Sequence, residues 1–162
     1  ATIVDCCRVA LDLRAVLAEL GLRCVVKTSG GKGLHLSVPL HGSTATDETT
    51  KHFALALGRL LERRDPARVL VDMTKERRAG KVFVDWSQND RHKTTVCAYS
   101  LRATPVPGVS TPIGWEEIEA VVDTDDGRAL AFDPATVVAR FDADGDLYAG
   151  SLAADQELPD LG

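Results

Sequence analysis

The chain has 162 residues, of which 44% are apolar and 27% are charged, and its formal net charge is −5. This composition is typical of one soluble globular domain and excludes a disordered chain. No apolar run approaches the roughly 18 residues of a membrane-spanning helix, and no signal segment is recognisable, so we expect a cytoplasmic protein with no membrane partner.

Helix and strand patterns alternate along the sequence. In chain order they predict a helix at 9–20, strands at 23–27 and 34–40, a helix at 47–64, strands at 82–86 and 94–99, and helices at 114–122 and 134–141. The strands at 82–86 and 94–99 are expected to form an antiparallel pair, and the Pro-rich stretch 104–112 a connecting loop. The prediction is a mixed α+β fold with helices packed on a largely antiparallel sheet.

Charge is unevenly spread along the chain. Residues 51–102 carry twelve Lys and Arg against six Asp and Glu, whereas residues 103–162 carry two against thirteen. Because phosphates are held mainly by Lys and Arg, the middle of the chain is where a polyanionic partner would bind. A patchy surface without function would show the same asymmetry, so both interpretations stay open.

A glycine-rich stretch, KTSGGKGLH at residues 27–35, is the first candidate site. Glycines allow backbone N–H groups to approach an anion, and Ser29 and Lys32 add a hydroxyl and a positive charge. His35 falls on the polar side of the strand that follows the turn. An ordinary hairpin turn would have a similar composition, and the glycine spacing does not match a Walker A motif, which disfavours a P-loop kinase.

Two charged residues stand at the ends of apolar strands. Asp85 follows an apolar run, where a carboxylate is costly to bury without a partner such as Mg²⁺ or Mn²⁺. Arg102 also follows an apolar strand and is suited to a bidentate contact with phosphate. The simpler alternatives are an Asp that caps a turn and an Arg that forms a surface ion pair.

Three segments in this order, VKTSGGKGLHLSVPL, GKVFVDWSQN and YSLRATPVPGVSTPIGWEE, carry a family resemblance. Together they resemble the polymerase domain of bacterial ATP-dependent DNA ligase D, the end-joining branch of the archaeo-eukaryotic primase superfamily. The resemblance covers about residues 4–150 and implies a primase-polymerase-like fold. We therefore expect residues 1–150 to form the C-terminal portion of such a domain and residues 151–162 to form an acidic, frayed tail.

The resemblance also implies an activity and its site. Family members transfer nucleotides from NTP or dNTP to the 3′ end of DNA under the direction of a template, with Mn²⁺ or Mg²⁺. Residues matching the family's motifs are implied to contact the nucleotide (Ser29, Lys32, His35, Gln88 and Arg102), to hold metal (Asp85) and to lie near DNA (Arg78). His35 and Asp85 are the implied catalytic residues.

One motif of the family does not appear in the sequence. An Asp-x-Asp pair is expected just before Thr2, and two-metal phosphoryl transfer needs several carboxylates. We therefore expect this chain alone to be inactive and to be part of a longer or two-part protein. The alternative is a degenerate homologue, a non-catalytic module that binds nucleotide or DNA. Implied partners are DNA ends, a fused or associated DNA ligase and the end-binding Ku protein, in the nucleoid of a bacterium.

Overall fold

The computed structural model describes residues 1–103, 107–153 and 155–159. Its helices and strands follow one another as α1 (Ile3–Glu19), β1 (Val25–Thr28), β2 (Leu34–Ser37), α2 (Asp47–Arg64), β3 (Val69–Leu70), β4 (Val82–Phe83), β5 (Leu101–Arg102), β6 (Gly108–Val109), β7 (Pro112–Ile113), α3 (Trp115–Thr124) and α4 (Pro134–Asp144). Short 3₁₀ helices include η1 (Lys75–Arg78) and η2 (Trp86–Gln88). In the described part of the chain, no helix has the length and apolarity needed to cross a membrane.

The two longest helices begin and end where their sequences provide caps. The side chain of Thr2 accepts a hydrogen bond from the amide of Asp5, and α1 therefore starts at Ile3, six residues earlier than predicted. The side chain of Thr46 accepts from the amide of Thr49, so that α2 spans the predicted residues 47–64. Acidic residues in the first turn of α2 and arginines in its last turn complement the helix dipole.

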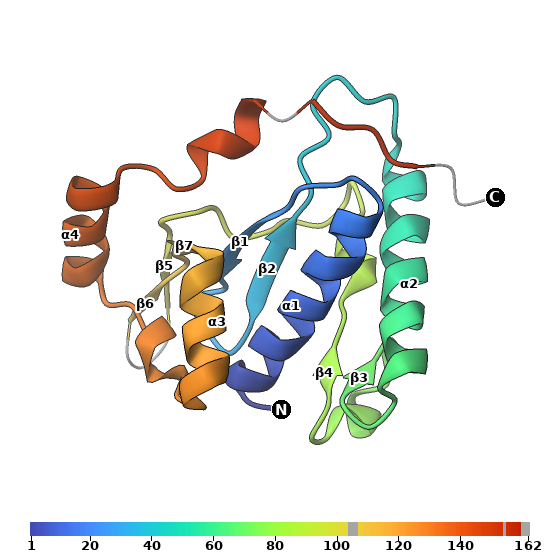
Figure 1. The fold of residues 1–162 in the computed structure, drawn as a ribbon, viewed down its shortest axis with the longest axis horizontal. Helices are drawn as coiled ribbons and strands as arrows, with labels where there is room; N and C mark the ends of the chain where they lie inside the picture. The colour runs from blue at the N-terminus through green and yellow to red at the C-terminus, as the bar shows by residue number, and fades with distance from the viewer. Residues whose placement is uncertain (104–106, 154, 160–162) are drawn as a thin grey trace.

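The central sheet has three strands in the order β2-β1-β7, and both pairings are antiparallel. The hairpin register places Lys27 opposite His35 and Thr28 opposite Leu34. Helix α1 crosses the front of this sheet, with α3 on one side of it and α2 on the other (Figure 1). The mixed α+β fold with largely antiparallel pairing is thus confirmed, although its strands are divided among three small sheets.

Helix α1 lies between two apolar clusters and contributes to both. One side of the helix packs with β1, β7 and α3 in a cluster that includes Val4, Cys7, Ala10, Val26, Ile113 and Ile118. The other side packs with α2, β3 and β4 in a cluster that includes Val9, Val16, Leu17, Phe53, Leu61 and Val82. The chain therefore has two halves that share one helix.

Two strand predictions are wrong. β4 covers only Val82–Phe83 and pairs in parallel with β3, and the chain turns into η2 directly after Asp85. Residues 94–99 form no strand, because side chains bind their backbone: Gln88 Nε2 donates to the Thr94 carbonyl at 2.8 Å and Lys27 Nζ to the Val96 carbonyl at 2.9 Å.

The predicted connecting loop at 104–112 is only partly correct. Residues 104–106 lie outside the described residues, but β6 pairs with β5 and β7 begins at Pro112, so this stretch supplies two strands. In the predicted tail, Asp155 forms a bridge with His41, and the buried Gln156 exchanges hydrogen bonds with the backbone of Arg23. The division of the chain at residue 150 stays a prediction.

Candidate active site

The glycine-rich turn is held in one conformation by its own serine. Ser29 Oγ accepts hydrogen bonds from the amides of Gly31 and Gly33, both at 3.2 Å, and the Ser29 amide donates to the Gly33 carbonyl at 2.8 Å. The prediction that glycine amides would surround an anion is therefore wrong for Gly31 and Gly33, because these two amides donate into the turn. An anion at this turn would depend on side chains.

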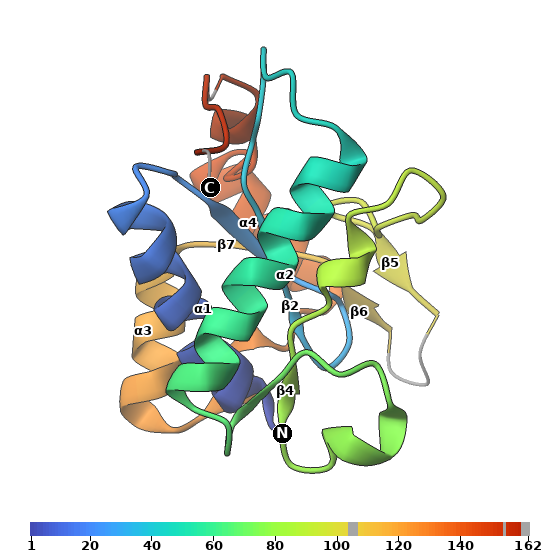
Figure 2. The same ribbon diagram turned by 90° about the vertical axis from the view of Figure 1, so that its right-hand side faces the viewer.

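Gly30 is the point where the turn meets the β5–β6 pair. Its φ is +69°, and a Cβ there would lie 2.9 Å from the Ser110 amide nitrogen and would also overlap the side chain of Arg102. Figure 2 shows the turn, in blue, between β4 and the β5–β6 pair. The absence of a side chain at Gly30 thus lets Arg102 lie directly over the turn.

A lysine that the sequence reasoning did not single out lies at the centre of this arrangement. Lys27 is 3% exposed, and its Nζ is 2.6 Å from Ser110 Oγ, 2.9 Å from the Val96 carbonyl oxygen and 3.0 Å from His35 Nδ1. The Ser110 hydroxyl in turn donates to the Thr28 carbonyl at 2.8 Å. Burial lowers the pKa of Lys27, and the nearby charge of Arg102 lowers it further while Cys97 opposes the shift.

The surroundings of His35 favour its neutral form. Burial lowers the pKa of His35 from its ordinary value, and the positive charges of Lys27 and Arg102 lower it further. The carboxylate of Asp85 acts in the opposite direction. His35, Arg102 and Asp85 are therefore close enough for their charges to interact, as expected of residues that share a site.

Asp85 is exposed at the end of β4 and is held through a short chain of hydrogen bonds. The buried hydroxyl of Ser87 donates to Asp85 Oδ1 at 2.7 Å and accepts from Lys93 Nζ at 2.7 Å. Within the described residues, no group of three or more His, Cys, Asp and Glu side chains could together hold a metal ion. The described residues thus supply no complete ligand set, and the assignment of Asp85 to a metal stays a prediction.

The remaining candidate residues lie around this centre. Lys32 is exposed in the turn, and Gln88 Nε2 donates to the Thr94 carbonyl at 2.8 Å and lies 3.2 Å from Thr95 Oγ1. Arg78 lies at the end of η1, and its guanidinium carbon is 3.7 Å from the centre of the Phe83 ring. The guanidinium also donates to the Met73 carbonyl at 2.7 Å. The side chain of Arg78 is therefore fixed against β4, two residues before Asp85.

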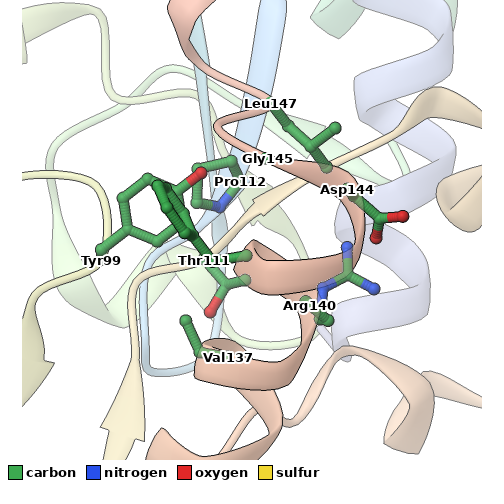
Figure 3. Close-up of a pocket in the computed structure, with 9 residues that line it drawn as sticks. Tyr99, Thr111, Pro112, Val137, Arg140, Asp144, Gly145 and Leu147 are labelled. Atoms are coloured by element: carbon green, nitrogen blue, oxygen red, sulfur yellow. The ribbon is translucent and has the colours of Figure 1, made fainter.

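Hollows elsewhere in the molecule do not involve these residues. One lies between the Tyr99 segment and α4 and has a volume of about 10 Å³, which suits no more than a water molecule (Figure 3). A larger, open hollow of about 590 Å³ lies beside α2 and is lined by Glu48, Thr49, His52, Phe53, Ala56, Leu158 and Pro159. Neither hollow is lined by a residue assigned to the candidate site.

Two signals in the sequence could have identified the missed lysine. A tight turn between Thr28 and Leu34 makes Lys27 the cross-strand neighbour of His35, and Lys27 follows two valines in an apolar strand. The part played by Ser110 had no such signal, because it comes from a segment more than 80 residues away.

A family model, sequence relatives and a solved structure all match this chain to LigD proteins. Residues 1–148 match the model of the family described as "LigD, primase-polymerase domain". The chain is 41% identical over 159 residues to the multifunctional non-homologous end joining protein LigD of Mycolicibacterium smegmatis, covering 98% of this chain and 20% of that protein. It is 43% identical over 152 residues to the LigD of Mycobacterium tuberculosis strain H37Rv, covering 94% and 19% respectively.

A solved structure agrees with the sequence relatives. The polymerase domain of Mycobacterium tuberculosis ligase D, determined in complex with DNA, superimposes with a TM-score of 0.85 at 38% identity over 96% of this chain and 52% of that one. The chain thus spans about a fifth of the length of the two LigD proteins and about half of the solved domain.

Proposed function

This chain belongs to the LigD primase-polymerase domain family, and we propose that it provides the nucleotide-binding part of a polymerase that repairs DNA by non-homologous end joining. The reaction is template-directed transfer of a nucleotide from NTP or dNTP to the 3′ end of a broken DNA strand. Two observations support this proposal: the side chain of Arg102 lies against Gly30 of the glycine-rich turn, and His35 is near enough to Arg102 and Asp85 for both charges to act on its pKa.

In this proposal the positive and hydrogen-bonding side chains bind the triphosphate. Arg102 lies over the turn and is exposed, so its guanidinium is accessible to a phosphate, and Lys32 adds charge at the tip of the turn. His35 contributes a ring N–H, Ser29 retains its hydroxyl proton for donation, and Gln88 contacts the nucleotide from η2. Arg78, fixed on Phe83, contacts the DNA backbone.

Asp85 would contribute one oxygen ligand to the divalent ion, Mn²⁺ or Mg²⁺, that family members use. Such an ion neutralises phosphate charge and orients the reacting oxygens when it is bound. Further ligands for that ion would have to come from outside the described residues, which hold no group of three or more His, Cys, Asp and Glu side chains suited to a metal. Fusion to a ligase and cooperation with Ku are part of the same proposal, because relatives are named as multifunctional end-joining proteins.

The test is nucleotide addition to a DNA 3′ end by the full-length protein in the presence of Mn²⁺. Asp85→Asn keeps the size of the side chain and removes its charge, so we expect addition to fall by about 100-fold or more. Asp126→Asn is the matched control, because this exposed carboxylate pairs with Arg128 on another surface. Unchanged addition by the Asp85→Asn protein would refute the assignment.

A second candidate, a binding module without chemistry, is supported by the lone carboxylate at the site. Titration of the chain with ATP, with and without Mn²⁺, separates the two functions. A polymerase site should bind ATP more tightly when Mn²⁺ is present, whereas a module should bind DNA through the basic segment 75–78 regardless of metal.

A further inference from the structure

The buried ammonium of Lys27 is fully occupied as a hydrogen-bond donor. A lysine ammonium has three N–H donors and no acceptor, and Lys27 Nζ lies within 3.0 Å of three acceptors: Ser110 Oγ, the Val96 carbonyl and His35 Nδ1. Ser110 is itself completely buried, so neither partner can exchange this contact for water. The three bonds join β1, β2, the 94–97 segment and the β6–β7 connection.

This contact determines the protonation of His35. Lys27 in its charged form can only donate, so His35 Nδ1 then accepts through its lone pair and the ring proton lies on Nε2. We propose that Lys27 is a positioning residue that holds His35 as the neutral Nε2–H tautomer and thereby gives it one N–H donor for the incoming triphosphate. The identity of the ligand rests on the proposed function, whereas the tautomer rests on the contact with Lys27 alone.

The charges around the ring support this assignment. Lys27 from β1 and Arg102 from β5 both disfavour the imidazolium, and Asp85 at the end of β4 is the group that favours it. A doubly protonated ring would also place two N–H donors, Lys27 Nζ and His35 Nδ1, 3.0 Å apart with no acceptor between them. The neutral ring avoids that conflict and keeps its orientation.

The consequence for nucleotide binding is a donor with a fixed direction. Lys27 is 3% exposed and reaches the ligand only through His35, so it adds no direct phosphate contact. Its role is to prevent rotation of the ring and exchange of its tautomer, which would otherwise present a lone pair to a negatively charged phosphate. Removing Lys27 should therefore weaken binding of the triphosphate more than it slows the chemical step.

The tautomer can be measured on the unmodified chain without any ligand. Long-range ¹H–¹⁵N correlation spectra distinguish Nε2–H from Nδ1–H histidines, and the signals of His35 are assigned by their loss in His35→Gln. We expect His35 to be in the Nε2–H form at neutral pH. An Nδ1–H tautomer or a charged ring at that pH would overturn the proposal, and this measurement does not depend on any variant of Lys27.

Lys27→Met then tests whether Lys27 is what sets the tautomer of His35. This variant keeps an unbranched side chain, one atom shorter, but removes the ammonium, so the pKa of His35 measured by NMR titration should rise, and the tautomer should become mixed. Lys81→Met is the matched control, because Lys81 Nζ donates to the Pro66 carbonyl at 2.7 Å on another part of the chain. If both variants leave the pKa and tautomer of His35 as in the wild type, Lys27 does not position the ring.

A purely structural role for Lys27 is tested by Ser110→Ala. This variant removes a buried acceptor of Lys27 and lowers stability, yet it leaves the bond from Lys27 to His35 in place. We expect Ser110→Ala to retain the Nε2–H tautomer, and its loss would show that general packing, not Lys27, holds the ring.

Binding of ATP in the presence of Mn²⁺ connects the tautomer to function. The dissociation constant should rise about ten-fold in Lys27→Met, which is the loss expected for one hydrogen bond. The NMR arm uses diamagnetic Mg²⁺, because Mn²⁺ would broaden the signals of a nearby ring. If the tautomer is as expected but wild-type His35 signals do not move when ATP binds with Mg²⁺, the proposed nucleotide site fails while the positioning by Lys27 stands. An unchanged dissociation constant in Lys27→Met, with His35 signals responding to ATP, would refute the effect on binding.

Discussion

The two sides of the candidate site are held in opposite ways. On the side of the glycine-rich turn, Lys27 and Ser110 are buried and bonded to each other, and Gly30 fits closely against the β5–β6 pair. On the side of β4, Asp85 is exposed and is held by the hydroxyl of Ser87, which lies in a short 3₁₀ helix. Lys27 and Ser110 each follow a residue of the apolar cluster, Val26 and Val109, whereas Asp85 comes two residues after the two-residue strand β4.

Because of this difference, we expect changes on the two sides to have different effects on stability and on activity. Polar groups that are buried with their partners form only when the core folds, so changes on the turn side should lower the free energy of unfolding. Groups that are held at the surface by one or two hydrogen bonds contribute little to folding. Changes on the Asp85 side should therefore lower activity with a smaller loss of stability.

The largest effect on stability is expected for Gly30→Ala. The positive φ of +69° is unfavourable for alanine, and the new Cβ would lie 2.9 Å from the Ser110 amide nitrogen. We expect the free energy of unfolding, measured by urea denaturation, to fall by about 2–3 kcal/mol.

Gly33→Ala is the matched control in the same turn. A Cβ at Gly33 would meet no atom within 4 Å, and the residue does not have a positive φ, so the loss should stay below about 1 kcal/mol. Equal losses in the two variants would mean that the turn is not fixed by its approach to β5–β6, and the contrast between the two sides would fail.

The sequence predicted the parts of the fold that depend on local signals. The helix at 47–64 matched its bounds because caps, charges at both ends and apolar spacing all agree. The strand at 94–99 failed because its carbonyls are bound by the side chains of Gln88 and Lys27, which alternation along a segment cannot reveal. The two sheets that β3–β4 and β5–β6 form were missed because each strand has only two residues.

Site prediction shows the same division between local and long-range information. His35, Asp85 and Arg102 were assigned from motifs and their roles stay predictions, although the charges of Arg102 and Asp85 do act on the pKa of His35. Lys27 was missed because its importance comes from contacts with Val96 and Ser110, which are far away in the sequence. Ser87 was missed because a serine two residues after an aspartate is common, and its burial was not predictable from a polar stretch.

Ser87→Ala should affect activity more than stability. The variant removes the donor to Asp85 and the acceptor of Lys93, so the carboxylate gains freedom to rotate. We expect nucleotide addition by the full-length protein to fall about ten-fold, and the free energy of unfolding to fall by about 1 kcal/mol. Ser43→Ala, which removes a comparable bond to the amide of Ala45, should leave addition unchanged. If the free energy of unfolding fell by more than about 1 kcal/mol while nucleotide addition fell by less than about ten-fold, the two sides of the site would not differ in this way.

The smallest effect concerns the dependence of stability on pH, and it tests whether His35 belongs to the buried side. Burial lowers the pKa of His35 below its ordinary 6.5, so the unfolded chain takes up this proton before the folded protein does. The contribution of His35 to stability is thus complete above about pH 6.5 and is lost as the pH falls toward its lowered pKa. Denaturation at about pH 7.5 and at about pH 5.5 should show a smaller decrease on acidification for His35→Gln than for the wild type. The two proteins have the same titrating groups except His35. Equal decreases in the free energy of unfolding would mean that His35 is as exposed as Asp85. The two sides of the site would then no longer differ in burial.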